Sequence, residues 1–123
     1  MNTHPQKIWI VGIVGPCGSG KTTLISAMQQ EMVHFRHIAQ EHSYVPTMWK
    51  QLTNPDVLIF LDASYEVTCQ RRHLNWTEAE YSEQHHRLDH ARKHADLYLM
   101  TDQLTPRNVQ DLVGKFLHEK GIL

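Results

Sequence analysis

One segment of the sequence has the residue types and the spacing of a phosphate-binding loop. Residues 15–22 read Gly-Pro-Cys-Gly-Ser-Gly-Lys-Thr and match the pattern G-x-x-x-x-G-K-[ST], after an apolar run and before an amphipathic stretch. Glycines leave room for backbone N–H groups to point at a phosphate, and a helix N-terminus adds free donors and a partial positive charge. We therefore expect the N–H groups of residues 18–23 to bind the phosphates of a nucleotide.

Side chains of this loop add chemistry of their own. Lys21 is able to reach the β- and γ-phosphates, and the hydroxyl of Thr22 is able to bind Mg²⁺. Cys17 is predicted to make the loop sensitive to oxidation, although the sequence offers no partner base for a catalytic thiol. The motif predicts a nucleotide-binding set of Gly15, Pro16, Cys17, Gly18, Ser19, Gly20, Lys21, Thr22 and Thr23.

A nucleotide site of this kind also needs an acidic group that orients Mg²⁺ or one of its water ligands. Asp62 directly follows the apolar run 57–61, so it fits a strand that ends on a carboxylate. Glu41 is the alternative, because it lies at the end of a short possible strand over residues 35–40. Both are candidate metal ligands.

The elements that would position these groups alternate between strands and helices. Apolar runs predict buried strands at residues 8–14 and 57–62, and a last strand at 97–100. The expected helices are a short one over 46–52 and longer ones starting at residue 21, at Ser64, at Thr77 (ending near residue 95) and at Thr105. This alternation predicts an α/β domain with a short, mainly parallel sheet flanked by helices.

The loop and the second half of the chain resemble the adenylate-kinase-like nucleotide kinases of the P-loop nucleoside triphosphatase superfamily. The loop resembles their G-P-P-G-S-G-K-G-T, with Cys17 and Thr22 in place of Pro and Gly. Residues 55–62 and 95–101 resemble two of their strands, and dephospho-coenzyme A kinase and thymidylate kinase are similar. The resemblance implies a three-layer domain that transfers a phosphoryl group from ATP or GTP with Mg²⁺. It also weakens Asp62 as the metal ligand, because the strand resembling 57–62 usually follows the metal-orienting strand.

The same resemblance gives roles to arginines. Residues 66–72 resemble the helix that enters an arginine-bearing lid, so Arg71 or Arg72 is expected to contact ATP and Arg87 to complete a lid over residues 71–95. Arginine suits this role because phosphoryl transfer spreads negative charge over the equatorial oxygens. Neighbouring residues on a helix point about 100° apart, so Arg71 and Arg72 cannot face one site equally.

The phosphoryl acceptor is not identified by these motifs. Only residues 34–54 are available for an acceptor-binding segment, which is too short for a helical acceptor domain, and a small loop at 43–46 with Trp49 is the candidate contact. We expect a small phosphotransferase acting on a nucleotide or small metabolite. Slow hydrolysis of the nucleotide, or nucleotide binding without turnover in a sensor or assembly module, are the alternatives.

Histidines are numerous, with ten in the chain. Three of them, His86, His90 and His94, recur every four residues and therefore share one face of the helix expected at 77–95. Zinc would suit such a face only with a further ligand, which the sequence does not show. A polar lid face that titrates near neutral pH is the preferred interpretation.

Composition excludes several other classes of protein. A length of 123 residues predicts one domain, and a net charge of −1 argues against a broad surface for nucleic acid or membranes. No apolar run approaches the roughly 20 residues of a membrane span, and two cysteines are too few for a disulfide framework, which predicts a cytoplasmic protein. Residues 1–6 are expected to be a flexible leader. A short sheet leaves an exposed edge, so a homo-oligomer is also expected.

Overall fold

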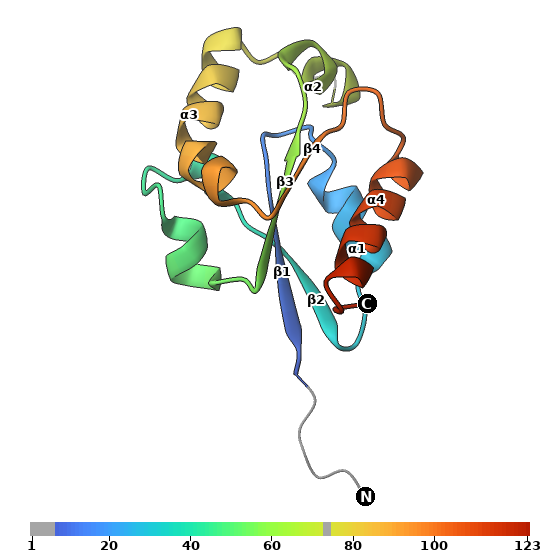
Figure 1. The fold of residues 1–123 in the computed structure, drawn as a ribbon. Helices are drawn as coiled ribbons and strands as arrows, with labels where there is room; N and C mark the ends of the chain where they lie inside the picture. The colour runs from blue at the N-terminus through green and yellow to red at the C-terminus, as the bar shows by residue number, and fades with distance from the viewer. Residues whose placement is uncertain (1–6, 73–74) are drawn as a thin grey trace, which may run out of the picture.

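The computed structural model describes residues 7–72 and 75–123, which form a four-stranded sheet between two layers of helices (Figure 1). The leader predicted at 1–6 lies outside the described residues. The strands are β1 (Trp9–Val14), β2 (Val33–His37), β3 (Val57–Asp62) and β4 (Leu97–Met100), in the order β2-β1-β3-β4. Every pairing is parallel, so the prediction of an α/β domain with a mainly parallel sheet is confirmed.

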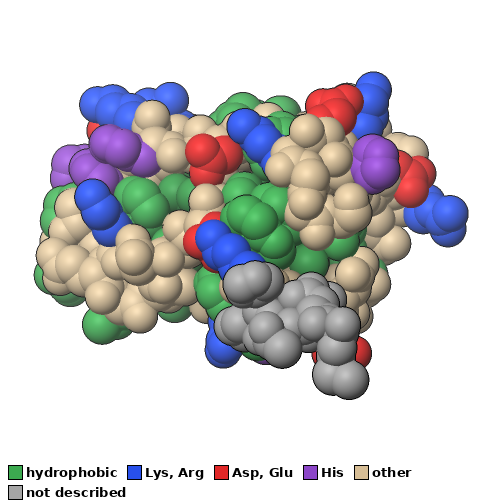
Figure 2. All heavy atoms as spheres, turned by 60° about the horizontal axis from the view of Figure 1, so that its bottom comes forward, with side chains coloured by type: hydrophobic (Ala, Val, Ile, Leu, Met, Phe, Trp, Pro, Cys, Tyr) green, Lys and Arg blue, Asp and Glu red, His purple; other side chains and the backbone are tan. Residues whose placement is uncertain are grey.

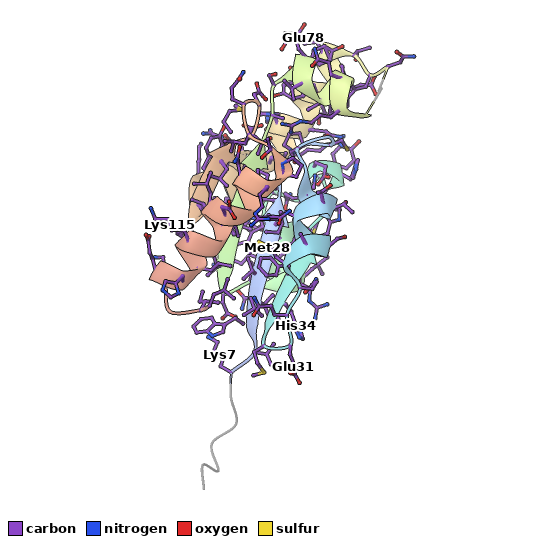
Figure 3. All side chains as sticks on the ribbon, turned by 90° about the vertical axis from the view of Figure 1, so that its right-hand side faces the viewer. Lys7, Met28, Glu31, His34, Glu78 and Lys115 are labelled. Atoms are coloured by element: carbon purple, nitrogen blue, oxygen red, sulfur yellow. The ribbon has the colours of Figure 1, made fainter. Side chains whose placement is uncertain are left out.

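One face of the sheet is covered by α1 (Lys21–Met28) and α4 (Pro106–Glu119). The apolar stripe of α4, which includes Val113 and Leu117, is fully buried against strand residues such as Ile13. The two helices also touch each other, and Figure 3 shows Met28 at the end of α1 between the two helices. Its methyl group lies 3.8 Å from the point where a side chain on Gly114 of α4 would begin. This layer fixes the direction in which α1 leaves the phosphate loop.

The opposite face is covered by α3 (Glu78–His94) and by η2 (Trp49–Thr53), a π-helical turn. Leu88 and Ala91 of α3 are fully buried against this face, so the helix expected in a lid is a core element of the domain. Trp49 is also buried there rather than free to meet an acceptor. The helix predicted at 46–52 corresponds to η2, which begins and ends slightly later in the chain.

Because all four strands are parallel, the segments that follow them meet at one edge of the sheet. The phosphate loop follows β1, a 3₁₀ turn η1 (Gln40–His42) follows β2, α2 (Tyr65–Arg72) follows β3, and a loop from Thr101 follows β4. The strand predicted over 35–40 ends at His37, and Ala39 then turns the chain into η1. This turn brings Glu41 beside the phosphate loop.

In the part of the chain that the structure describes, β2 and β4 are the outer strands, and self-association through such an edge stays a prediction. None of the described helices combines the length and apolar character needed to cross a membrane.

Candidate functional site

A cavity of about 810 Å³ lies at the carboxyl edge of the sheet, within the range of known ligand pockets. Its walls come from the phosphate loop and the start of α1, from the end of β2 and η1, from α2, and from the loop after β4 with the start of α4. The lining residues are Cys17, Gly18, Ser19, Gly20, Lys21, Thr22, Thr23, Leu24, His37, Glu41, His42, Arg71, Thr101, Leu104, Pro106 and Val109. The phosphate loop therefore forms one whole wall of the cavity.

The loop keeps its backbone donors free. In the described residues, the N–H groups of Lys21, Thr22 and Thr23 make no hydrogen bond, as expected for the first turn of a helix, and those of Gly18 and Gly20 make none either. The helix begins at Lys21, directly after Gly20, so these five donors all lie in the end of the loop and the first turn of α1. A row of unpaired N–H groups at a helix N-terminus is a site for anions such as phosphate.

Lys21 lies inside the cavity wall as part of a buried ion pair. Its ammonium nitrogen is 3.0 Å from Oε2 of Glu41, and it donates hydrogen bonds to the carbonyl oxygens of Gly15 and Pro16 at 2.6 and 3.0 Å. Lys21 is only 6% exposed and Glu41 only 2%. The Oε1 atom of Glu41 and the hydroxyl of Ser19 are both buried, and neither has a hydrogen-bond partner within the described chain. The site thus contains one ion pair and two polar atoms that a ligand could bind.

Arg87 holds the turn that carries Glu41. Its guanidinium donates to the backbone oxygen of Glu41 at 3.3 Å, pairs with Glu83 at 3.2 Å, and lies over the ring of Tyr44. Gln40, which is fully buried, bonds to the backbone of Val45, Trp49 and Arg87. Arg87 does not line the cavity, so its role in the structure is to position Glu41.

Arg71 is the arginine that reaches the cavity. It donates to the hydroxyl of Thr101 at 2.8 Å, to the backbone oxygen of Thr101 and, at 3.4 Å, to that of Gly18. The Thr101 hydroxyl in turn donates to the backbone oxygen of Asp62 at 2.8 Å. These bonds connect α2, the phosphate loop and the end of β4. The side chain of Arg72 lies outside the described part of the chain.

Cys17 has two polar neighbours, Gln84 and His42, that the sequence did not reveal. Gln84 of α3 accepts from the N–H of Cys17 at 3.0 Å and donates to its sulfur at 3.3 Å, so it fixes the loop to α3. His42 places Nε2 3.8 Å from the same sulfur. His37 lies on the cavity wall, where partial burial and the positive charge of Lys21 lower its pKa. Gln84 is 67 residues from Cys17, and no spacing rule links the two.

The order of these features along the chain also matches a known family. A model of the KAP family P-loop domain matches residues 1–65, slightly more than half of the chain. The chain belongs to this family. The match includes the phosphate loop and the turn that carries Glu41, and it supports nucleotide binding by a P-loop nucleoside triphosphatase domain. A search of curated proteins found no match.

Asp62 of this KAP-family domain has its own partners and does not line the cavity. Its carboxylate accepts from the Ala63 N–H at 2.9 Å and from the Tyr98 hydroxyl at 2.6 Å, and lies 3.1 Å from Nε2 of His85. Burial alone would raise the pKa of Asp62, but the contacts with His85 and Tyr98 lower it. Burial and the Asp62 charge also raise the pKa of Tyr81 to about 12. The structure therefore brings Glu41, rather than Asp62, to the phosphate loop.

We expect Asp62→Asn to destabilise the domain by about 1–3 kcal/mol at pH 7, because it removes the charge to which a buried hydroxyl and a histidine bind. The lowered pKa means that the carboxylate stabilises the fold above its unfolded pKa, and that this stabilisation is lost as pH falls through the folded value. The difference between wild type and Asp62→Asn should therefore shrink between about pH 5 and pH 2 in urea unfolding.

The matched control is Asp89→Asn on α3, whose carboxylate is solvent-screened although Lys93 and Arg92 lower its pKa. Its effect should be much smaller at every pH. Equal effects of the two substitutions would contradict a special role for Asp62 in stability.

Two histidines of α3, His90 and His94, pack beside Trp49 in the KAP-family domain. Nδ1 of His90 accepts from the indole N–H of Trp49 at 3.1 Å, and the rings of His90 and His94 stack 4.2 Å apart. Figure 2 shows histidine side chains gathered on the side of the molecule where α3 lies in Figure 1, with lysine and arginine side chains around them. Over residues 7–72 and 75–123, no third metal-ligating side chain joins this pair.

Proposed function

We propose that this domain binds a nucleoside triphosphate with Mg²⁺ and transfers the terminal phosphoryl group to a small acceptor, as a nucleotide-kinase-like phosphotransferase. The observation that supports this most directly is the Lys21–Glu41 pair, buried in the wall of a cavity whose other face is a row of free N–H groups. A lysine in this position is able to bind the β- and γ-phosphates, and a carboxylate beside it is able to bind the Mg²⁺ that accompanies them.

The phosphates would lie against the loop. Free N–H groups of residues 18 and 20–23 would bind their oxygens, and Lys21 would neutralise the terminal charge by exchanging one of its present partners for a phosphate oxygen. Arg71 approaches the loop from α2 and would stabilise charge on the transferring group. The Arg72 and Arg87 roles expected from the kinases are not needed for this arrangement.

The donor set of the cavity fits Mg²⁺. Thr22 offers an exposed hydroxyl on the cavity wall, and Glu41 offers a buried carboxylate oxygen that has no partner in the described chain. Both are the oxygen ligands that this hard cation prefers, directly or through water. Bound Mg²⁺ would neutralise charge on the phosphates, while Thr22 and Glu41 hold it in place.

The nucleoside would lie against the loop after β4 and the first turn of α4. Leu104, Pro106 and Val109 give this part of the cavity an apolar wall, as a flat base requires. These side chains do not discriminate between adenine and guanine by hydrogen bonding, so both ATP and GTP are candidate substrates.

Hydrolysis with water as the acceptor is the second candidate function. It is favoured by the position of residues 43–54, none of which lines the cavity, and by the burial of Trp49 in the core. The acceptor loop expected at 43–46 therefore does not reach the phosphate loop.

Thermal and chemical denaturation with Mg²⁺ and ATP or GTP tests nucleotide binding. A nucleotide at 100 times its dissociation constant is expected to add about 2.7 kcal/mol to stability. Adenosine, which lacks phosphates, should add almost nothing, and a chelator should reduce the effect of ATP. Absence of any stabilisation by ATP, GTP or their diphosphates would refute the proposal.

Turnover is then measured with ATP labelled on its terminal phosphate. Label in a nucleoside, nucleotide or metabolite supports phosphotransfer, whereas free phosphate without an added acceptor supports hydrolysis. Binding without either product would assign the domain to the sensor or assembly class.

A further inference from the structure

We propose that the mouth of the phosphate loop is also a site for a soft divalent cation of the zinc type, held by Cys17, Glu41 and His42, and that this cation excludes the nucleotide. The exclusion rests on the proposed nucleotide site, whereas the cation site itself does not.

The three side chains converge from two segments of the chain. Cys17 comes from the loop after β1, and Glu41 and His42 come from the turn after β2. One ligand atom from each lies within 4.8 Å of the other two. Nε2 of His42 is 3.8 Å from the Cys17 sulfur and 4.0 Å from Oε2 of Glu41. Among residues 7–72 and 75–123, no other group of three such side chains comes this close together.

These distances are close to those of a metal-bound triad. Tetrahedral zinc with usual bond lengths separates a sulfur and a nitrogen ligand by about 3.6 Å. A rotation of the exposed His42 side chain would bring its nitrogen to that distance. The other two ligands are already held in place. Gln84 bonds to the backbone and sulfur of Cys17, and Arg87 bonds to the backbone of Glu41. The site therefore has both ligands and supporting contacts.

The chemistry of the donors selects the cation. A thiolate and an imidazole favour Zn²⁺ or Co²⁺ over Mg²⁺, which prefers oxygen ligands. On binding, the Cys17 thiol releases its proton to solvent, and neutral His42 binds through Nε2 with its proton on Nδ1. Oε2 of Glu41, the oxygen 4.0 Å from Nε2 of His42, is the one paired with Lys21, whereas Oε1 has no partner in the described chain. A turn of the carboxylate would present Oε1 to the cation while Oε2 keeps the ion pair. Water would complete four-fold coordination.

Exclusion of the nucleotide follows from shared residues. Glu41 is the carboxylate proposed for Mg²⁺, and Cys17 lies within the loop that would surround the phosphates. A cation bound to both residues takes the Glu41 carboxylate away from Mg²⁺ and ties Cys17 of the loop to it, so the cation and the Mg-nucleotide compete for the same ligands. Zinc would therefore act as a competitive inhibitor of nucleotide binding.

Cobalt reports thiolate ligation directly. Reduced, untagged full-length protein with one equivalent of Co²⁺ is expected to show a thiolate-to-cobalt charge-transfer band in the near ultraviolet. Cys17→Ser should abolish the band, and Cys69→Ser, which changes the other cysteine, should keep it. Serine is able to accept the Gln84 hydrogen bond, and thermal unfolding of each variant checks the fold.

Zinc affinity is measured by competition with a chromophoric chelator. His42→Ala should weaken binding at least about 100-fold, since loss of even a supporting contact costs 10- to 100-fold. His86→Ala, at an exposed position of α3, should change zinc affinity less than twofold. His94→Ala removes background binding by the stacked pair with His90. A Cys17→Ser protein that keeps the band, a wild type without one, or equal effects of His42→Ala and His86→Ala would overturn the site.

The exclusion is tested by nucleotide binding with and without Zn²⁺. Zinc should raise the apparent dissociation constant of Mg-ATP for wild type at least tenfold. For His42→Ala, the dissociation constants with and without zinc should be nearly equal. Unchanged wild-type affinity would overturn the exclusion. A cobalt band in a protein that binds no nucleotide would refute the proposed function and leave the cation site standing.

Discussion

Lys21→Ala is expected to destabilise the ligand-free domain by about 3–5 kcal/mol as well as to abolish nucleotide binding. A loop lysine that only awaited a phosphate would leave the fold intact when removed. Lys21 instead neutralises Glu41 in a position where neither side chain is more than 6% exposed. Removing one charge of a buried pair leaves the other without compensation, and this costs far more than the pair contributes as a whole. Urea unfolding at pH 7 measures the loss.

The double variant Lys21→Met with Glu41→Gln separates stability from binding. It removes both charges and keeps the volumes of the side chains similar, so it should recover most of the stability lost in Lys21→Ala. It should still not bind Mg-ATP measurably, because the Lys21 contact to the phosphates and the Glu41 contact to the metal are both lost. A Lys21→Ala protein as stable as wild type would contradict the buried ion pair, and a double variant that binds ATP would contradict the role of the pair in the site.

The ion pair also sets a condition for nucleotide binding. The ammonium group of Lys21 has three N–H bonds, and the structure gives it three oxygen neighbours, from Gly15, Pro16 and Glu41. A phosphate oxygen therefore has to replace one of them. Mg²⁺ beside Glu41 would make that exchange easier, since it supplies the carboxylate with another positive charge. Nucleotide and metal are thus expected to bind together more tightly than either binds alone.

Local sequence rules were sufficient for the elements of this domain. Continuous apolar residues located β1 and β3, and helix-start residues located α3 and α4. Thr77 and Thr105 each accept a hydrogen bond from the backbone N–H three residues later, as their types and positions predict. The loop motif located the phosphate wall of the cavity. These features depend on neighbours within a few positions of each other, which is the range over which sequence patterns are informative.

The choice between Asp62 and Glu41 depended on contacts across the sheet. Asp62 ends β3 and Glu41 lies in the turn after β2, and both residue types are suited to a metal. β1 pairs with β2 on one side and β3 on the other, so strand order alone brings either carboxylate near the loop. The difference lies in two side chains that bind the Asp62 carboxylate, Tyr98 from β4 and His85 from α3. No pattern near residue 62 contains that information.

The position of α3 also depended on contacts across the sheet. The resemblance to nucleotide kinases placed residues 71–95 in a lid. A helix needs only a narrow apolar stripe to pack on a sheet, and Leu88 and Ala91 supply it. Histidine and glutamine then satisfy neighbours in the core, as His90 does for Trp49 and Gln84 for Cys17. Most of α3 is therefore exposed, as its polar composition indicates, while a few residues on one face attach it to the sheet.

Gly15→Ala is expected to cost at least about 3 kcal/mol, enough to unfold a domain of ordinary stability, because two effects add. The backbone of Gly15 has a φ of 152°, a conformation almost confined to glycine. A methyl group there would lie 2.0 Å from the backbone oxygen of Leu61 in β3. That oxygen belongs to a buried strand and has no rotamer by which to move away. The strand and the phosphate loop would have to separate.

Gly114→Ala in α4 is the matched control for Gly15→Ala. The nearest atom to its added methyl group is the end of the Met28 side chain at 3.8 Å, an ordinary contact. Replacing a helical glycine with alanine should stabilise the domain by about 0.5–1 kcal/mol. Urea unfolding of the two variants should therefore shift in opposite directions. If Gly15→Ala unfolded at the wild-type urea concentration, Leu61 of β3 would not lie against the loop as the structure has it.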